Sequence, residues 1–217
     1  MKIRLLVADD HDVVRQGLRF YLRPDEEVEI VGEAADGEEA VAIARELRPD
    51  VVLMDLLMPR MNGIEATERI KAELPEVEIV ALTSVLEDDA VTGAIRAGAI
   101  GYLLKNTKAE ELSAAIRGAA AGQVQLAPEA AERLMREVRL TERPEELTGR
   151  ETEVLVGLAQ GRADKEIARN LYVEERTVKA HVTSILRKLK LKSRTQAALY
   201  AVRTGLVSLD DLGEESW

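Results

Sequence analysis

Two kinds of segment alternate through the first 125 residues of the chain, and this alternation constrains the fold more than any other feature of the sequence. Short apolar runs rich in β-branched residues occupy 3–8, 28–34, 51–54, 77–82 and 100–104. Between and after them lie stretches with the apolar spacing of helices, at 12–22, 37–47, 63–74, 87–97 and 108–121. Strands and helices in strict alternation predict a five-stranded parallel sheet that helices cover on both faces.

An acidic residue ends one of these apolar strands. The segment VVLMDLLMPRMNG, residues 51–63, places Asp55 directly behind four apolar residues, where a buried charge would be costly. Right-handed crossovers give such a chain a doubly wound α/β fold, for which we expect the flavodoxin-like strand order. Ligands of these folds bind just beyond the carboxyl ends of the strands. Asp55 is therefore expected to lie in a site rather than in the core.

The other strands also end in polar side chains. The first strand leads to Asp9 and Asp10, the fourth ends near Thr83, and the fifth leads to Lys105. Three carboxylates that meet at one edge of a sheet would raise one another's pKa unless a cation joined them. A hard divalent ion, Mg²⁺ above all, suits a site built from oxygen ligands and leaves positions open for water and phosphate.

The same residues resemble the receiver domain of two-component response regulators. The resemblance rests on ADDH (8–11), MDLLMP (54–59), LTS (82–84) and YLLK (102–105), and it covers about the first 120 residues. It implies a CheY-like fold in which Asp55 accepts a phosphoryl group from a phosphohistidine of a sensor histidine kinase. Lys105 would pair with the phosphoryl oxygens, Thr83 would donate its hydroxyl to the aspartyl phosphate, and Tyr102 would rotate inward as a switch.

The resemblance also implies how the metal would be held. Asp10, Asp55 and the backbone carbonyl of Leu57 would bind Mg²⁺, and Asp9 would assist. A phosphatase of the haloacid dehalogenase type also uses a strand-end aspartate as nucleophile, but its second aspartate is replaced here by Leu57. Without that general acid we expect a phosphoacceptor with at most slow self-dephosphorylation, not an enzyme. His11, beside the two aspartates, suggests a metal or acid/base role, but a histidine at the start of a helix is interpreted as structural.

Charge is unevenly distributed along the chain. The net charge is −10, yet residues 148–205 hold twelve Lys and Arg against six Asp and Glu. A compact basic block within an acidic chain is typical of a module that binds nucleic-acid phosphates. The lack of cysteine excludes a disulfide framework, and two histidines are too few for the usual zinc sites. No apolar run is long enough for a spanning helix, so we expect a cytoplasmic protein with no membrane partner.

The basic block has the pattern of a helix-turn-helix. Thr148 and Glu151 form a capping box, Gly161 ends the first helix, and Asp164 is the expected N-cap of the second. A third helix is predicted over 175–189. Its inward face would carry Val178, Val182, Ile185 and Leu189, and its outward face would carry Arg176, Ala180, Thr183 and Arg187. A cationic face with small side chains can enter the major groove of DNA.

This block resembles the LuxR-type DNA-binding domain, a small all-α unit of four helices. The resemblance rests on LTGRE, GRADKEIARNL, RTVKAHVTSILRKL and KSRTQAA, and it covers 147–206. With the receiver motifs, it makes the chain similar to response regulators of the NarL/FixJ family, and TSVLEDD (83–89) and RAGAIGYLLK (96–105) resemble the LiaR/VraR-like branch of that family. The implied DNA contacts are Arg176, Thr177, Lys179, Ala180, Thr183, Ser184, Arg187 and Lys188. The implied partners are double-stranded operator DNA, a second copy of the chain after activation and, as a further candidate, RNA polymerase.

Some features depart from the family pattern or extend it. Glu174 stands where members often carry serine, and an acidic side chain there would repel nearby phosphate. Thr183 stands where lysine is common. The last helix, over 193–204, offers a small-residue contact face for a second subunit: Ala197, Ala198 and Ala201.

These motifs also set the expected domain boundaries. A receiver over 1–122 is followed by a linker over 123–146 with a short helix from Pro128 to Leu140; a sixth receiver helix is the alternative interpretation. The DNA-binding domain takes 147–206 and an acidic tail takes 207–217. A stand-alone phosphate-handling enzyme would leave the basic block unused, and a phosphorylation-independent regulator would lack part of the acidic pocket. The sequence therefore favours a transcription factor that phosphorylation controls.

Overall fold

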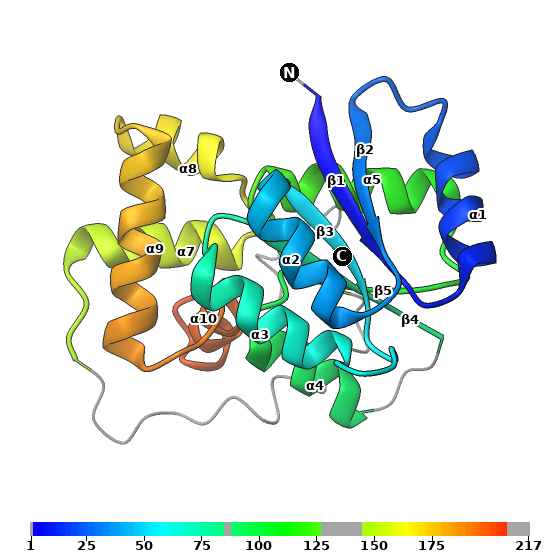
Figure 1. Cartoon of the computed structure of the whole chain (residues 1–217). Helices are drawn as coiled ribbons and strands as arrows, with labels where there is room; N and C mark the ends of the chain where they lie inside the picture. Colours follow the sequence, from blue (N-terminus) through cyan, green and yellow to red (C-terminus); the bar gives the residue numbers. More distant parts are fainter. Residues whose placement is uncertain (1, 85–87, 127–144, 208–217) are drawn as a thin grey trace.

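The computed structural model describes residues 2–84, 88–126 and 145–207. Its first part is built on one parallel sheet with the strand order β2-β1-β3-β4-β5-β6 (Figure 1). The strands are β1 (Ile3–Ala8), β2 (Val28–Ala34), β3 (Val51–Asp55), β4 (Glu78–Thr83), β5 (Gly101–Leu104) and β6 (Gln125–Leu126). The expected flavodoxin-like order of the first five strands is confirmed. The two-residue β6 lies in the predicted linker, where no strand was expected, and it pairs with β5.

Helices cover both faces of this sheet. They are α1 (Asp12–Leu22), α2 (Gly37–Leu47), α3 (Gly63–Glu73), α4 (Asp88–Ala97) and α5 (Ala109–Ala120). Helices α1 and α5 lie together on one face, and α2, α3 and α4 form a row on the other (Figure 1). Each helix starts and ends within one residue of its predicted position. The helix boundaries that the alternation of strand and helix predicts are therefore confirmed.

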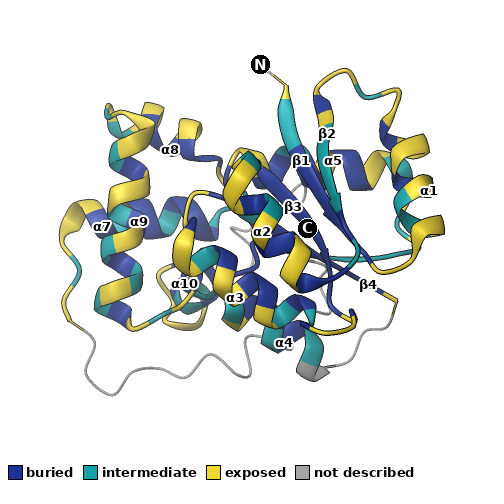
Figure 2. Ribbon diagram, viewed as in Figure 1, coloured by how far each residue is buried: buried dark blue, intermediate teal, exposed yellow. Residues whose placement is uncertain are grey.

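Successive residues of a strand enter different apolar cores. On one face, Leu5 and Val7 of β1 join a core that includes Leu18, Leu22, Leu112 and Ile116. On the other face, Leu6 and Ala8 join a core that includes Ala40, Val41, Ala44 and Ile70. Strand β3 is buried at every residue, and Figure 2 shows it dark between its covering helices. This two-sided burial, worth about 1.5–3 kcal/mol for each large apolar side chain, holds the strand that presents Asp55.

The second part of the chain is helical. It consists of α7 (Gly149–Ala159), α8 (Asp164–Leu171), α9 (Glu175–Leu189) and α10 (Arg194–Arg203). The predicted capping box is confirmed, because the Glu151 N–H donates to Thr148 Oγ1 and the Thr148 N–H donates to Glu151 Oε2. The predicted inward face of α9 is also confirmed by the burial of Val178, Val182, Ile185 and Leu189.

The expected cap of α8 is wrong. Ala163 holds the N-cap position, and its N–H donates to the carboxylate of Glu166 at 2.9 Å. Asp164 is the first residue of the helix, and its carboxylate instead pairs with Arg194 at 2.9 Å. Arg194, thirty residues further along the chain, thus binds the Asp164 carboxylate that the local sequence pattern had predicted as the helix cap.

The expected subunit-contact face on α10 is buried in this arrangement of the chain. Ala197 and Ala201 are 0 % exposed and Ala198 is 5 % exposed, and α10 packs against α7, α9 and, in the receiver, α4. Small side chains at these positions allow the helices to approach closely within one chain. A role of this face in pairing with a second subunit stays a prediction.

The two parts of the chain contact each other directly. Thr195, fully buried at the start of α10, donates its hydroxyl to the carbonyl of Ala99 at 3.2 Å. The Asp164 N–H donates to the carbonyl of Ala121 at 3.1 Å. One apolar core continues from the sheet into the helical part. The structure is therefore a closed arrangement of the two parts.

Some sequence predictions fall on other parts of the chain. The predicted helix from Pro128 to Leu140 and nearly all of the predicted acidic tail lie outside the described residues. The domain boundaries stay predictions. Where the chain is described, no helix combines the length and the apolar character needed to cross a bilayer.

Candidate functional site

Three strand ends bring charged side chains together at one edge of the sheet. Asp55 is the last residue of β3, Asp9 comes just after β1, and Lys105 follows β5. The Lys105 ammonium lies 2.7 Å from Asp55 Oδ2 and 2.8 Å from Asp9 Oδ2. Asp9 is 0 % exposed and Asp55 is 2 % exposed. A single ammonium therefore bridges two buried carboxylates. The two carboxylates lie close together because β1 and β3 are neighbouring strands of the sheet.

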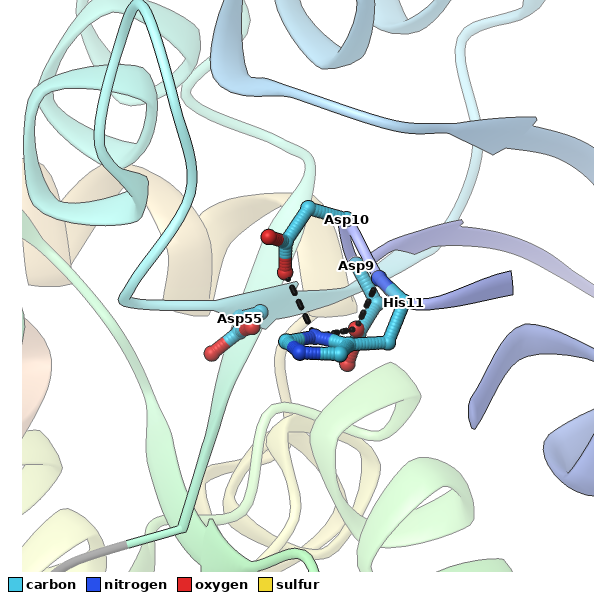
Figure 3. A group of neighbouring side chains, drawn as sticks. All are labelled: Asp9, Asp10, His11 and Asp55. Atoms are coloured by element: carbon cyan, nitrogen blue, oxygen red, sulfur yellow. Dashed lines mark hydrogen bonds and ion pairs between the residues drawn. The ribbon is translucent and has the colours of Figure 1, made fainter. Parts of the chain in front are cut away.

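Asp10 and His11 extend this cluster (Figure 3). His11 Nδ1 lies 2.7 Å from Asp10 Oδ1 and 3.3 Å from Asp9 Oδ1. Ligand atoms of Asp9, Asp10, His11 and Asp55 all lie within 4.8 Å of one another. Figure 3 shows the His11 ring beside both carboxylates of the first strand end, with Asp55 approaching from β3. The imidazole therefore contacts both aspartates, although the sequence interpretation favoured a structural role at the start of the helix.

Burial and hydrogen bonding have opposing effects on each pKa in this cluster, and the pKa values of Asp55 and Lys105 are both raised. Burial raises the pKa of Asp55 above its ordinary value, although hydrogen bonds from Lys105 and from the Leu57 amide oppose the shift. Burial by itself would lower the pKa of Lys105, but hydrogen bonds to Asp55 and Asp9 outweigh it and the pKa is raised. The lysine therefore stays protonated at neutral pH and acts as the counter-charge of the carboxylates.

The turn after β3 presents the Asp55 side chain. The Leu57 N–H donates to Asp55 Oδ1 at 3.2 Å, and the Gly63 N–H donates to the carbonyl of Leu56 at 3.1 Å. A Cβ atom at Gly63 would lie 1.9 Å from the backbone oxygen of Asp55. Only glycine permits this approach of α3 to the strand end. Gly63 thus supports the site, and the sequence motifs had not identified it as a site residue.

Thr83 and Tyr102 lie on β4 and β5, the two strands that follow β3 in the sheet. Thr83 ends β4 and is 2 % exposed, and its carbonyl accepts a hydrogen bond from the Lys105 N–H at 2.7 Å. Tyr102 of β5 lies in register with Ala81 of β4 and is 1 % exposed. The backbone therefore ties Thr83 to the site lysine, and the Tyr102 side chain lies in the interior. Their roles as a switch stay predictions.

The donor set at this edge fits a hard divalent cation. Asp9, Asp10 and Asp55 supply carboxylate oxygens close enough to share one ion. Carboxylate oxygens are the protein ligands that Mg²⁺ prefers. Two of these carboxylates are already paired with one lysine, so the pocket can hold more positive charge without an excess. The residues present are therefore compatible with the metal that the sequence predicted.

The outward face of α9 forms a second candidate site. Its exposed members are Arg176, Lys179, Ala180, Thr183 and Arg187, while Thr177 is half-buried. The Thr183 hydroxyl donates back to the carbonyl of Lys179 at 3.0 Å. Arg187 lies 3.3 Å from the Glu145 carboxylate, and both side chains remain exposed. The cationic face that the helical period predicted is thus present on the surface of the helix.

Two predicted DNA contacts point elsewhere. Ser184 donates its hydroxyl to Glu151 Oε1 at 2.6 Å, and the Lys188 ammonium donates to Glu151 Oε2 at 2.6 Å. Glu151 belongs to α7 and is 4 % exposed. The structure therefore does not bring Ser184 and Lys188 to the outward face, because their side of α9 faces α7.

Glu151 is the residue of this domain whose importance the sequence reading understated. Hydrogen bonds from Lys188, then from Ser184 and the Thr148 amide, lower the pKa of Glu151 to about 2. The capping box identified this glutamate but accounted for only one of its partners. Nothing in the local pattern indicates that a helix three dozen residues away would supply the other two donors.

The outward face of α9 is turned partly toward the receiver. A hollow of about 410 Å³ lies between the two parts of the chain. From α9 it is lined by Lys179, Ala180 and Thr183, and from the receiver it is lined by Lys71 and Glu78 among others. Three predicted DNA contacts therefore face another part of the same protein in this arrangement.

Two family models match the chain. The model described as the response regulator receiver domain matches residues 5–117, and the model described as bacterial regulatory proteins, luxR family, matches residues 145–201. Transcriptional regulatory protein LiaR of Bacillus subtilis (strain 168) is 46% identical over 210 residues, which cover 95% of this chain and 100% of that protein. Response regulator protein VraR of Staphylococcus aureus (strain NCTC 8325 / PS 47) is 42% identical over 208 residues, with 95% and 100% covered.

A solved structure of two RcsB dimers bound to two parallel DNAs is also similar. Its TM-score is 0.56 at 25% identity, and the match covers 94% of this chain and 99% of that chain. The similarity thus extends over both parts of the molecule, in sequence and in structure. The chain belongs to the response regulators of the NarL/LuxR family, two-component proteins that join a receiver domain to a LuxR-type DNA-binding domain and regulate transcription.

Proposed function

We propose that a sensor histidine kinase phosphorylates this protein on Asp55 and that the reaction controls binding to operator DNA. The observation that carries the proposal is the Lys105 ammonium held between the buried carboxylates of Asp55 and Asp9. Phosphoryl transfer depends mainly on in-line positioning and on neutralising the charge of the equatorial oxygens. A strand-end carboxylate with a fixed cation beside it supplies both requirements.

In the proposed reaction, a carboxylate oxygen of Asp55 attacks the phosphorus of a phosphohistidine. The bond between the imidazole nitrogen and phosphorus breaks as the new oxygen–phosphorus bond forms, and the electron pair of the broken bond stays with the imidazole. The Lys105 ammonium would move from the carboxylate to a phosphoryl oxygen. Mg²⁺, held by Asp10, Asp55 and the carbonyl of Leu57 with help from Asp9, would supply further positive charge toward the phosphoryl oxygens.

The aspartyl phosphate would persist long enough to act as a signal. A rapid phosphatase needs a general acid close to the phosphorylated carboxylate. Leu57, which occupies the position two residues after Asp55, carries no titratable group, and its side chain is 66% exposed. We therefore propose a phosphoacceptor with slow self-dephosphorylation rather than a turnover enzyme.

The signal must then reach DNA through a change of conformation, since Asp55 and α9 belong to different parts of the molecule. We propose that Thr83 and Tyr102 rearrange around the phosphoryl group, that α9 leaves the receiver, and that two receivers pair. Two copies of α9 would then occupy half-sites about one helical turn, or a small multiple, apart. The RcsB dimers solved on DNA support this arrangement. RNA polymerase would be a partner of the DNA-bound dimer.

The proposal is tested by incubating the full chain with Mg²⁺ and a small phosphodonor and measuring the intact mass. We expect the mass of one phosphoryl group to be added, none in the Asp55→Asn variant, and little in the presence of a chelator. Glu46→Gln, which changes an exposed carboxylate of α2, is the control and should be phosphorylated normally. Full phosphorylation of Asp55→Asn would refute the assignment of the acceptor.

A further inference from the structure

The N-terminus of α9 lacks a side-chain cap, as do those of α1, α5 and α8, and its N-cap residue is acidic. Side chains at the N-cap accept the backbone N–H three residues on in α2, α3, α7 and α10, through Asp36, Asn62, Thr148 and Ser193. Glu174 holds the N-cap position of α9 with an extended backbone, and its side chain makes no such bond. Its carboxylate turns instead to Arg176, with Oε2 2.5 Å from the guanidinium Nε.

Both members of this ion pair are exposed. The Glu174 side chain is 68% exposed and the Arg176 side chain is 84% exposed. An exposed pair is weak because water and salt screen it, so a competing anion can displace the carboxylate from Arg176. The pair therefore contributes little to the stability of the domain. Its main effect is on the availability of Arg176 to an anionic ligand.

The surroundings of this pair are cationic. A shallow hollow of about 460 Å³ is lined by Lys165 and Arg169 of α8 together with Glu174, Glu175 and Arg176. Its charges come from two adjacent helices, and the positive end of the α9 dipole adds to them. Phosphates of a DNA backbone that followed the outward face of α9 would pass this hollow, since Arg176 and Lys179 lie on successive turns of that face.

We propose that Glu174 is an affinity-setting residue of the DNA-binding domain, which occupies Arg176 within the chain and thereby weakens its contact with a DNA phosphate. The inference rests on the proposed function, in which the outward face of α9 binds DNA. A carboxylate at this position has two effects on the complex. It cancels the charge of the guanidinium, and it repels the phosphate that the guanidinium would bind.

Removal of the carboxylate should therefore strengthen DNA binding and make it more dependent on salt. In Glu174→Gln the shape of the side chain is kept and Arg176 is released. We expect the affinity of each bound α9 for duplex DNA to rise about two- to fivefold, the range given by the strength of an exposed ion pair. The log–log dependence of affinity on salt should steepen by about 0.9, the value for one added phosphate contact.

The neighbouring residue provides a control of equal charge. Glu175 is also exposed and also lies in the first turn of α9, but no ion pair of Glu175 occurs in the part of the chain that the structure describes. Glu175→Gln changes the net charge and the helix dipole interaction in the same way as Glu174→Gln. A general electrostatic effect would therefore appear in both variants, whereas loss of the pair with Arg176 appears in one.

The test is a double-mutant cycle on the full chain, phosphorylated with a small phosphodonor. The probe is a duplex selected from a random pool by the unaltered protein, titrated at several salt concentrations. We expect Glu174→Gln to gain affinity, Glu175→Gln to gain less, and the gain of Glu174→Gln to disappear when Arg176→Gln is also present. Thermal unfolding of each variant checks that the domain is intact. Because all three side chains are exposed, we expect the substitutions to leave folding unchanged.

Two results would overturn the inference. Equal gains from Glu174→Gln and Glu175→Gln would mean that only net charge matters, and a gain that survives Arg176→Gln would mean that Glu174 acts on another group. Failure of the proposed function would look different, because the unaltered protein would then select no duplex from the pool. The two failures are therefore separable.

Discussion

At the scale of single residues, two buried carboxylates of this protein have opposite titration behaviour. Burial raises the pKa of Asp55, whereas donors from three directions lower the pKa of Glu151 to about 2. Asp55 has one ammonium and one amide as partners, and Glu151 is hydrogen-bonded by Lys188, Ser184 and the Thr148 amide. The difference matches their expected roles, because a nucleophile must remain free to react and a structural anion must not.

Glu151→Gln should destabilise the helical domain. The substitution removes the charge that Lys188 pairs with and leaves a half-buried ammonium without its counter-ion. Because Lys188 keeps some exposure and can turn to water, we expect a loss of about 1–3 kcal/mol in the free energy of unfolding. Urea unfolding followed by circular dichroism measures this loss. Glu153→Gln, which breaks an exposed pair with Arg150, is the control and should stay within about 0.5 kcal/mol.

The stability that Glu151 contributes should depend on pH with a definite sign. Its pKa is lower in the folded state than the ordinary value of 4.5, so the contribution is complete above pH 4.5 and is lost as the pH falls toward about 2. The gap between the unaltered protein and Glu151→Gln should therefore narrow over this interval. A gap that stays constant from pH 6 to pH 2.5 would contradict the lowered pKa.

At the scale of secondary-structure elements, α9 has two distinct functions on two sides. Its inward residues pack in the core and its flank holds α7 through Glu151, while its outward face carries Arg176, Lys179 and Arg187. The first two interactions fix the orientation of the helix. The outward face can therefore be changed without loss of the fold, which makes it suitable for mutation.

The variant Lys179→Ala with Arg187→Ala should bind duplex DNA more weakly and with less dependence on salt. Each lost phosphate contact should lower the log–log salt slope by about 0.9, and both side chains are exposed, so folding should be unaffected. Titration of a duplex at several salt concentrations gives both quantities. The matched control, Arg23→Ala with Arg69→Ala, removes the same charge from exposed positions of the receiver. Equal losses in both variants would count against this face of α9.

At the scale of the whole molecule, closure of the two parts combines a shared apolar core with a few polar contacts. Thr195 of α10 bonds to the carbonyl of Ala99, which lies between α4 and β5. The same connection leads into β5, which carries Tyr102. A rearrangement at the phosphorylation site therefore has a short covalent path to the contact that holds the helical part in place.

Thr195→Val should shift the unphosphorylated protein toward an open form. The substitution keeps the buried shape and removes one hydrogen bond, worth about 1 kcal/mol, so we expect affinity for duplex DNA to rise about fivefold before phosphorylation and little after it. Thr204→Val is the control, since the Thr204 hydroxyl bonds only within α10 in the described residues. Sedimentation of the same samples with and without phosphodonor reports whether opening is linked to pairing. If affinity rose equally in both states, the contact would not be part of the switch.

Much of the fold could be predicted because its signals are local. Helix and strand periods placed ten elements of the receiver within about one residue, and the inward face of α9 followed from a spacing of three and four. The candidate site was predicted from position alone, since parallel strands must bring Asp9, Asp55 and Lys105 to one edge. The errors occurred where a local rule competed with a distant partner, as when Arg194 took the carboxylate of Asp164.

The sequence by itself determined the order of the elements, the edge at which the acidic residues meet and the basic character of the second part. These depend on periods and strand ends, which are properties of short segments. Only the tertiary structure decided that Ser184 and Lys188 serve Glu151, that the alanines of α10 lie inside, and that α9 faces the receiver. Side-chain direction on a helix flank, and the docking of one domain on another, depend on groups that approach from far along the chain. Their energies arise only when both partners are in place, and no window of sequence contains both.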